Sequence, residues 1–165
     1  MDRIIEEAGS VYRKYGSEDL GYVAEKLGAE IHEDLRAENA REVYFPDLQA
    51  ILLRPGLPAH ERRYLIAHAL GHHLFHRTGV NAASISFKDD AACGILRGRR
   101  AEVSPTEREA DVFAAYLLVA PVRLRQILEQ EWVDDSEDPV LKLALEFQVS
   151  VELMNERLIL KGLRR

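Results

Sequence analysis

The densest group of chemically reactive side chains in the sequence is a run of histidines. Four of the six histidines fall between residues 68 and 76, in the string HALGHHLFH. On a helix, His68 and His72 lie one turn apart on the same face, so both imidazoles can reach one metal ion. His73 is turned about 100° away, and His76 lies about 12 Å along the axis from His68. The spacing favours a metal site on His68 and His72, with His76 as an orienting or helix-end residue. Two surface histidines one turn apart also arise by chance.

A metal site needs a third ligand, and the segment after Ser104 offers three acidic residues. The string SPTE at residues 104–107 is typical of a capping box, which already gives Glu107 a structural role. Glu109 has no such role, and apolar residues follow it one turn later, so coordination would remove the cost of an unpaired charge there. Asp111, on a different face, could orient a ligand histidine by accepting its second N–H. For Glu109 and Asp111 the alternative is an ion pair with an arginine.

Two imidazoles and one carboxylate leave a coordination position open, which is the layout of catalytic rather than structural zinc. The same donor set also holds iron in some oxygenases, but two ligands on one helix favour zinc. In the helical H-E-x-x-H arrangement, a glutamate directly after the first histidine accepts a proton from water. Here that position is Ala69. Loss of a general base typically lowers the rate by about 10²–10⁴ while leaving the ligands in place. The sequence therefore predicts a metal site with lost or crippled hydrolysis, in a natural pseudo-enzyme or an inactivated mutant.

The elements that must position these residues can be read from hydrophobic periodicity and turn residues. A helix is expected at residues 2–15 and a second after Ser17, ended by Gly28. A metal-bearing helix is expected at about 60–77, and a further helix opens at Ser104 and ends before Pro121. We assign no structure to residues 80–103. Three short strands are expected at 30–35, 42–45 and 49–53. Three more helices are expected toward the C-terminus, at about 124–128, 140–147 and 151–160. The strands at 42–45 and 49–53 should form a hairpin.

Length and composition indicate one ordinary globular domain spanning residues 1–165, with 130–165 as an integral C-terminal helical pair. The lone Cys93 excludes an internal disulfide and thiolate metal clusters, and a role in switching a metal site is a remote alternative. No apolar run is long enough for a membrane span and the N-terminus is unlike a signal peptide, so we expect a cytoplasmic protein. A net charge of -6 argues against general nucleic-acid affinity. Basic patches at 88–100 and at the C-terminus leave local DNA contact open.

Two segments together resemble the ImmA/IrrE family of bacterial and phage zinc metallopeptidases. RRYLIAHALGHHLFHR (62–77) is similar to the family's metal-binding helix, and EREADVFAAYLLVAP (107–121) is similar to its second motif. The flanking segments at 19–31 and 144–158 are also similar, so the likeness covers nearly the whole chain. The departure is Ala69, where the family carries its catalytic glutamate.

The resemblance implies a zincin-like α+β fold, in which a three-stranded sheet lies beside the metal-bearing helix and the remaining helices are C-terminal. It implies Zn²⁺ held by His68, His72 and Glu109. It also implies proteolysis of a regulatory protein, often a helix-turn-helix repressor of phage, mobile-element or stress genes. The alternative is a non-catalytic regulatory module that binds a transcription factor or DNA, supported by the C-terminal helical pair with Arg157 on its second helix.

Overall fold

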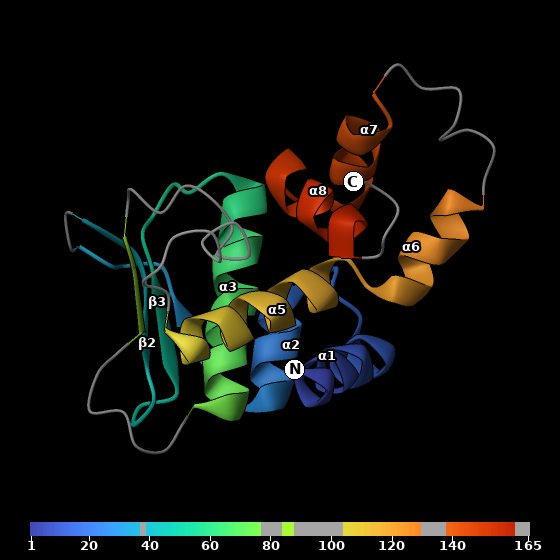
Figure 1. Ribbon diagram of the computed structural model, residues 1–165. Helices are drawn as coiled ribbons and strands as arrows, with labels where there is room; N and C mark the ends of the chain where they lie inside the picture. Colours follow the sequence, from blue (N-terminus) through green and yellow to red (C-terminus); the bar gives the residue numbers. More distant parts are fainter. Residues whose placement is uncertain (37–38, 77–83, 88–103, 130–137, 161–165) are drawn as a thin grey trace.

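The computed structural model describes residues 1–36, 39–76, 84–87, 104–129 and 138–160 (Figure 1). The described residues do not include Cys93, Trp132 or the basic patch at 88–100. Of the C-terminal basic patch they include only Arg157. Seven helices and one small sheet make up the described parts. The α+β class expected from the sequence is therefore confirmed. No helix among the described residues is both long enough and apolar enough to cross a membrane.

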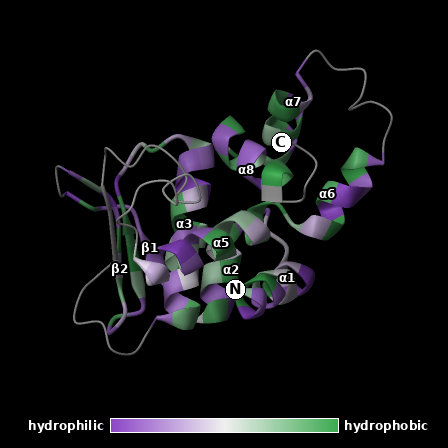
Figure 2. Ribbon diagram, viewed as in Figure 1, coloured by the Kyte–Doolittle hydropathy of each residue, from purple (hydrophilic) through white to green (hydrophobic). Residues whose placement is uncertain are grey.

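The N-terminal helices α1 (Asp2–Tyr15) and α2 (Leu20–Leu27) form as their amphipathic patterns predict. Hydrophilic and hydrophobic residues are both present along α1 in Figure 2, and its apolar residues Ile4, Ala8 and Val11 are buried. Asp19 rather than Ser17 caps α2, because its side chain accepts a hydrogen bond from the Tyr22 N–H. Gly28 ends α2 in the left-handed conformation, at φ 82°.

The sheet contains the three strands expected from the sequence and one more. Its strands are β1 (Glu30–His32), β2 (Ala40–Phe45), β3 (Ala50–Leu53) and β4 (Ser84–Phe87), in the spatial order β1-β3-β2-β4. The predicted hairpin of β2 and β3 is antiparallel, with Phe45 paired to Ala50, whereas β1 and β3 are parallel. The expectation of three strands missed β4, which pairs antiparallel with β2 at the edge of the sheet. A four-residue strand carries too little alternation to be recognised without its partner.

The central helix α3 (Ala59–Phe75) lies between the sheet and helix α5 (Pro105–Leu118) (Figure 1). Hydrophilic residues interrupt the hydrophobic ones along α3 in Figure 2, yet every residue from Leu65 to His73 is buried. The two helices approach closely because residue 71 is glycine: a Cβ there would lie 2.8 Å from the Ala110 Cα. This close approach brings the histidines of α3 against the first turns of α5.

The last three helices are α6 (Pro121–Leu128), α7 (Pro139–Phe147) and α8 (Val151–Leu160), and they lie on the side of α5 away from the sheet (Figure 1). Arg157 of α8 is 2% exposed, donates a hydrogen bond to the Val119 carbonyl at 3.0 Å and stacks over the Tyr116 ring. Its charge therefore holds α8 against the end of α5. The idea that Arg157 contacts DNA is wrong for this structure, because the guanidinium does not reach the surface.

Candidate metal centre

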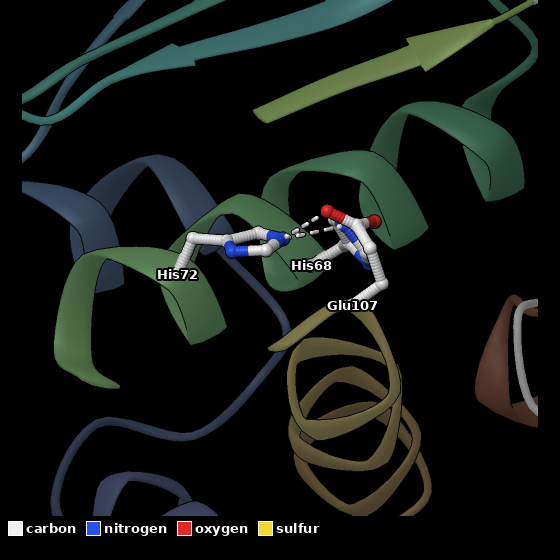
Figure 3. Close-up of side chains that lie close together, drawn as sticks. All are labelled: His68, His72 and Glu107. Carbon is white, nitrogen blue, oxygen red and sulfur yellow. Dashed lines mark hydrogen bonds and ion pairs between the residues drawn. The ribbon is translucent and has the colours of Figure 1, made fainter. Parts of the chain in front are cut away.

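Three side chains from α3 and α5 meet at one point (Figure 3). The Nε2 atoms of His68 and His72 are 3.1 Å apart. One carboxylate oxygen of Glu107 lies 3.3 Å from His68 Nε2, and the other lies 3.2 Å from His72 Nε2. Both imidazoles are buried, with 1% and 5% of their residue surface exposed, whereas the Glu107 side chain is 25% exposed. The cluster is thus a nearly enclosed group with one partly open side.

The spacing of these atoms fits a tetrahedral metal ion. Zinc binds histidine nitrogen and carboxylate oxygen at about 2.0–2.2 Å, so neighbouring ligand atoms in a tetrahedron are about 3.3–3.6 Å apart. The separation of 3.1 Å between the two Nε2 atoms, and those of 3.3 and 3.2 Å from these atoms to the two Glu107 oxygens, are near that edge length. Two neutral nitrogen donors and one carboxylate are also a donor set that zinc prefers. The residues present therefore fit a zinc ion with one coordination position left open.

The sequence predicted Glu109 as the third ligand, but the carboxylate that lies beside the two histidines in the structure is that of Glu107. Ser104 caps α5 by accepting a hydrogen bond from the Glu107 backbone N–H at 3.2 Å. This part of the capping box uses only the main chain of Glu107, so its carboxylate can turn toward the histidines. Glu107 and Asp111 are one turn apart and share the face of α5 that meets α3. Glu109 is turned about 200° from Glu107 around the helix and contacts His76.

Asp111 lies behind His68, where an orienting residue would be expected. Its Oδ1 accepts a hydrogen bond from His68 Nδ1 at 2.9 Å and a second one from the Tyr64 hydroxyl. Asp111 is fully buried. Because Nδ1–H of His68 is donated to this carboxylate, the Nε2 atom of the neutral ring presents its lone pair to the cluster.

His72 is oriented in a similar way, by two hydrogen bonds in series. Its Nδ1 lies 3.2 Å from Nδ1 of His76, and Nε2 of His76 donates to the Glu109 carboxylate at 2.9 Å. Since the Glu109 contact places the His76 proton on Nε2, Nδ1 of His76 accepts from His72. The Nε2 atom of His72 then also presents a lone pair to the cluster. His76 and Glu109 thus lie one step outside the cluster of His68, His72 and Glu107.

His73 points away from the cluster and has a structural role. Its Nε2–H donates to the Leu27 carbonyl at 2.9 Å, and its Nδ1 accepts from the Tyr44 hydroxyl at 2.8 Å. It therefore ties α3 to the end of α2 and to β2. Its ring nitrogens are both engaged there, which excludes His73 as a ligand in this conformation.

The protonation states of the metal-free cluster follow from burial and the neighbouring carboxylates. Burial alone would lower the pKa of His68, but hydrogen bonds to Asp111 and Glu107 outweigh it and raise that pKa to about 10. For His72, burial and the nearby charge of His68 outweigh the hydrogen bond to Glu107, so its pKa is lowered. Burial would raise the pKa of Glu107, but its bonds to the two histidines hold it well below the usual range. At neutral pH the cluster thus carries one imidazolium and one neutral imidazole.

The position after His68 offers no proton acceptor. Ala69 is fully buried, and it lies one turn before His73 on the part of α3 that faces the sheet. A second buried acid, Glu42 of β2, was not singled out from the sequence. The available signal was the two-residue spacing of Glu42 and Tyr44 on a strand, which puts an acidic residue on the same face as a large aromatic one.

Comparison with known families shows a match over most of the chain. The family model described as the IrrE N-terminal-like domain, a peptidase family, matches residues 24–159. This range includes Ala69 and all three members of the ligand cluster. No curated protein matches the chain.

Proposed function

The chain belongs to the IrrE N-terminal-like domain family, and from that premise we propose that it is a zinc-binding metallopeptidase-type protein that acts on another protein. The zinc ligands in this proposal are His68, His72 and Glu107. The observation that supports it best is the meeting of three potential ligands at the contact of α3 and α5: the two Nε2 atoms are 3.1 Å apart, and each lies within 3.3 Å of one Glu107 carboxylate oxygen.

A bound zinc ion would act as a Lewis acid and lower the pKa of a water molecule in the open position. The residues of the chain have separate tasks around it. Asp111 and His76 orient the two ligand histidines and fix their tautomers. Glu107 supplies a negative charge that offsets part of the charge of the ion, and its partial exposure leaves that side of the cluster open to a substrate.

The substrate class in this proposal is a regulatory protein, in particular a helix-turn-helix repressor of phage, mobile-element or stress genes. This part rests on the resemblance of the two motifs at 62–77 and 107–121 to the ImmA/IrrE metallopeptidases. Ala69 cannot accept a proton, so α3 supplies no general base, and hydrolysis is lost or crippled unless another residue does so.

Ala69 also favours a second candidate function. A peptidase scaffold without a general base can retain its grip on a protein chain, so the chain would act as a regulatory module that binds a transcription factor. A version of this function that uses Arg157 to contact DNA is disfavoured, because that guanidinium is buried. Binding of a repressor without cleavage, in the presence of zinc, would support this second candidate.

The proposal is tested by the metal content of the purified protein, measured by mass spectrometry for zinc and iron together. We expect about one zinc per chain, lost in the His68→Ala/His72→Ala variant. Glu107→Ala should lower zinc affinity far more than Glu109→Ala, which removes only an outer contact. Iron in place of zinc, or full zinc content in the double-histidine variant, would contradict it.

A further inference from the structure

Glu42 is a buried acidic side chain that the metal centre described above does not use. It lies on β2, 0% of its surface is exposed, and its cross-strand neighbours are Leu53 of β3 and Ser86 of β4. Glutamate is among the residues that are almost never fully buried unless they are paired. What the Glu42 carboxylate can do therefore depends on what β2 faces at this position.

The side chain of Glu42 lies on the face of β2 that is turned toward α3. Side chains two residues apart on a strand point to the same face, so Glu42 shares its face with Tyr44. The Tyr44 hydroxyl donates to His73 of α3 at 2.8 Å, which shows where that face is directed. Glu42 is thus directed at the central helix.

Two contacts fix the part of α3 that Glu42 faces. Arg41 forms an ion pair with Glu61, near the beginning of α3, whereas Tyr44 reaches His73, three turns later. Strand and helix therefore run in the same direction, and Glu42 lies nearer the beginning of α3 than Tyr44 does. Two residues on a strand span about 6.8 Å, close to the 6 Å that four helical residues span. One turn before His73 is Ala69.

Ala69 is on the correct side of α3 to be opposite Glu42. Gly71 faces α5, because a Cβ there would meet Ala110, and Ala69 lies about 160° around the helix from Gly71. Ala69 is fully buried and has no side chain beyond its Cβ atom. The negative charge of Glu42 also acts on His68, where it contributes to the raised pKa. The carboxylate of Glu42 is thus near the first ligand histidine, on the side where α3 has only a methyl group.

We propose that Glu42 supplies, from β2, the proton-accepting carboxylate that α3 lacks at Ala69. The proposal rests on the peptidase function proposed above and identifies its general base. A glutamate on α3 and a glutamate on β2 would reach the same space from opposite sides. Ala69 then leaves the space that the Glu42 carboxylate occupies, and the proposed peptidase site has a general base.

The step assigned to Glu42 is a proton transfer during peptide hydrolysis. The oxygen of a water molecule bonds to the carbonyl carbon, and one proton of that water passes to the Glu42 carboxylate. The C–N bond then breaks, and Glu42 returns the proton to the departing nitrogen. The products are a carboxylic acid and an amine, and Glu42 ends in its starting state.

The first test removes the carboxylate from β2 and then adds one to α3. It uses the zinc-loaded full chain, with fluorescently labelled casein as the probe substrate. Glu42→Gln should lower the cleavage rate by about 10²–10⁴ while zinc content stays near one. Adding Ala69→Glu to that variant should restore most of the rate. Glu61→Gln is the matched control, because it removes a carboxylate from the same interface about 10 Å along α3 from His68 and should change the rate less than about threefold. If Glu42→Gln does not fold, Glu42→Asp withdraws the carboxylate and should also lower the rate.

The outcomes separate this proposal from the function on which it rests. An unchanged rate in Glu42→Gln overturns the proposal, and so does cleavage that appears only after Ala69→Glu. If zinc binds but the unmodified chain does not cleave casein, the role of Glu42 is overturned and the zinc site stands. If no zinc binds, the proposed function fails as well.

The second test needs neither metal nor activity. In zinc-free protein, Ala69→Glu places a second buried carboxylate beside that of Glu42. Because a buried negative charge without a compensating positive charge is strongly destabilising, Tm should fall by roughly 10 °C. In the Glu42→Gln background the same change should lower Tm by less than half as much. Ala69→Gln, which adds the volume without the charge, should have the same effect in both backgrounds. Equal Tm losses for Ala69→Glu in the two backgrounds would show that the two positions are not adjacent and would overturn the proposal.

Discussion

Zinc binding at this site should displace one proton from His68. In the metal-free cluster, hydrogen bonds to Asp111 and Glu107 raise the pKa of His68 to about 10, whereas the pKa of His72 is lowered. The pKa of Glu107 is also lowered, so at pH 7 this carboxylate is already ionised. Zinc requires a free lone pair on Nε2 of each histidine. The proton that must leave on binding is therefore that of His68.

The size of the effect follows from the distance between pH and pKa. A pH of 7 is about three units below the pKa of His68, so more than about 99% of the metal-free molecules carry that proton. Apparent zinc affinity should then rise about tenfold for each unit of pH between 6 and 8, which is about 1.4 kcal/mol per unit.

Isothermal titration calorimetry measures this proton directly. Titrations of zinc at one pH, in buffers with different enthalpies of ionisation, should give observed enthalpies whose slope corresponds to about one proton released. Asp111→Asn removes the charge that holds the proton, so its slope and its pH dependence should both be smaller. A slope near zero in the unmodified protein, with affinity independent of pH between 6 and 8, would refute the assigned protonation state.

Further predictions concern stability and the outer contacts. Zinc at about one hundred times its Kd should raise Tm by roughly 5–10 °C, and a chelator should reverse the shift in thermal melts. His76→Ala should weaken zinc binding about 10–100-fold, because it no longer orients His72, while His73→Ala should lower Tm and leave zinc affinity within a few-fold. Gly71→Ala should reduce the free energy of unfolding by about 1–3 kcal/mol in urea titrations, because its Cβ would lie 2.8 Å from the Ala110 Cα; no loss would mean that α3 and α5 pack less closely. The Tm of zinc-free protein should fall as pH rises from 6.5 toward 10, since the raised pKa of His68 stabilises the fold below that range and the contribution is lost above it; His68→Ala should flatten the profile.

Local sequence signals were sufficient for the helices and for the two histidines. The pair His68 and His72 needs only helical spacing to share a face, and Gly28 ends α2 in the left-handed conformation that its position predicts. The hairpin of β2 and β3 follows from a short turn between two β-prone runs. These features depend only on residues a few positions apart, so they can be predicted from local sequence.

The third member of the cluster could not be assigned so simply. A capping box was a sound reason to give Glu107 a structural role, and Ser104 does cap α5. The cap, however, uses the Glu107 main chain and leaves the carboxylate to the histidines. Which acid faces α3 depends on the rotation of α5, and that is set by the close approach of Ala110 to Gly71. Such a packing contact between distant segments is not readable from local spacing.

The edge strand and the buried glutamate depend even more on long-range pairing. β4 is recognisable only beside β2, which is far from it in the sequence. That Glu42 faces α3 is known only because Tyr44, two residues later on the same face of β2, reaches His73. Both features are defined by the sheet and not by the residues that form them.

The metal centre is tested most directly by the anomalous difference density of zinc-loaded crystals, collected on both sides of the zinc absorption edge. We expect one peak between His68 Nε2, His72 Nε2 and the Glu107 carboxylate, with Glu109 remaining on His76. A peak whose carboxylate ligand is Glu109, or zinc-soaked crystals with no peak at these histidines, would contradict it.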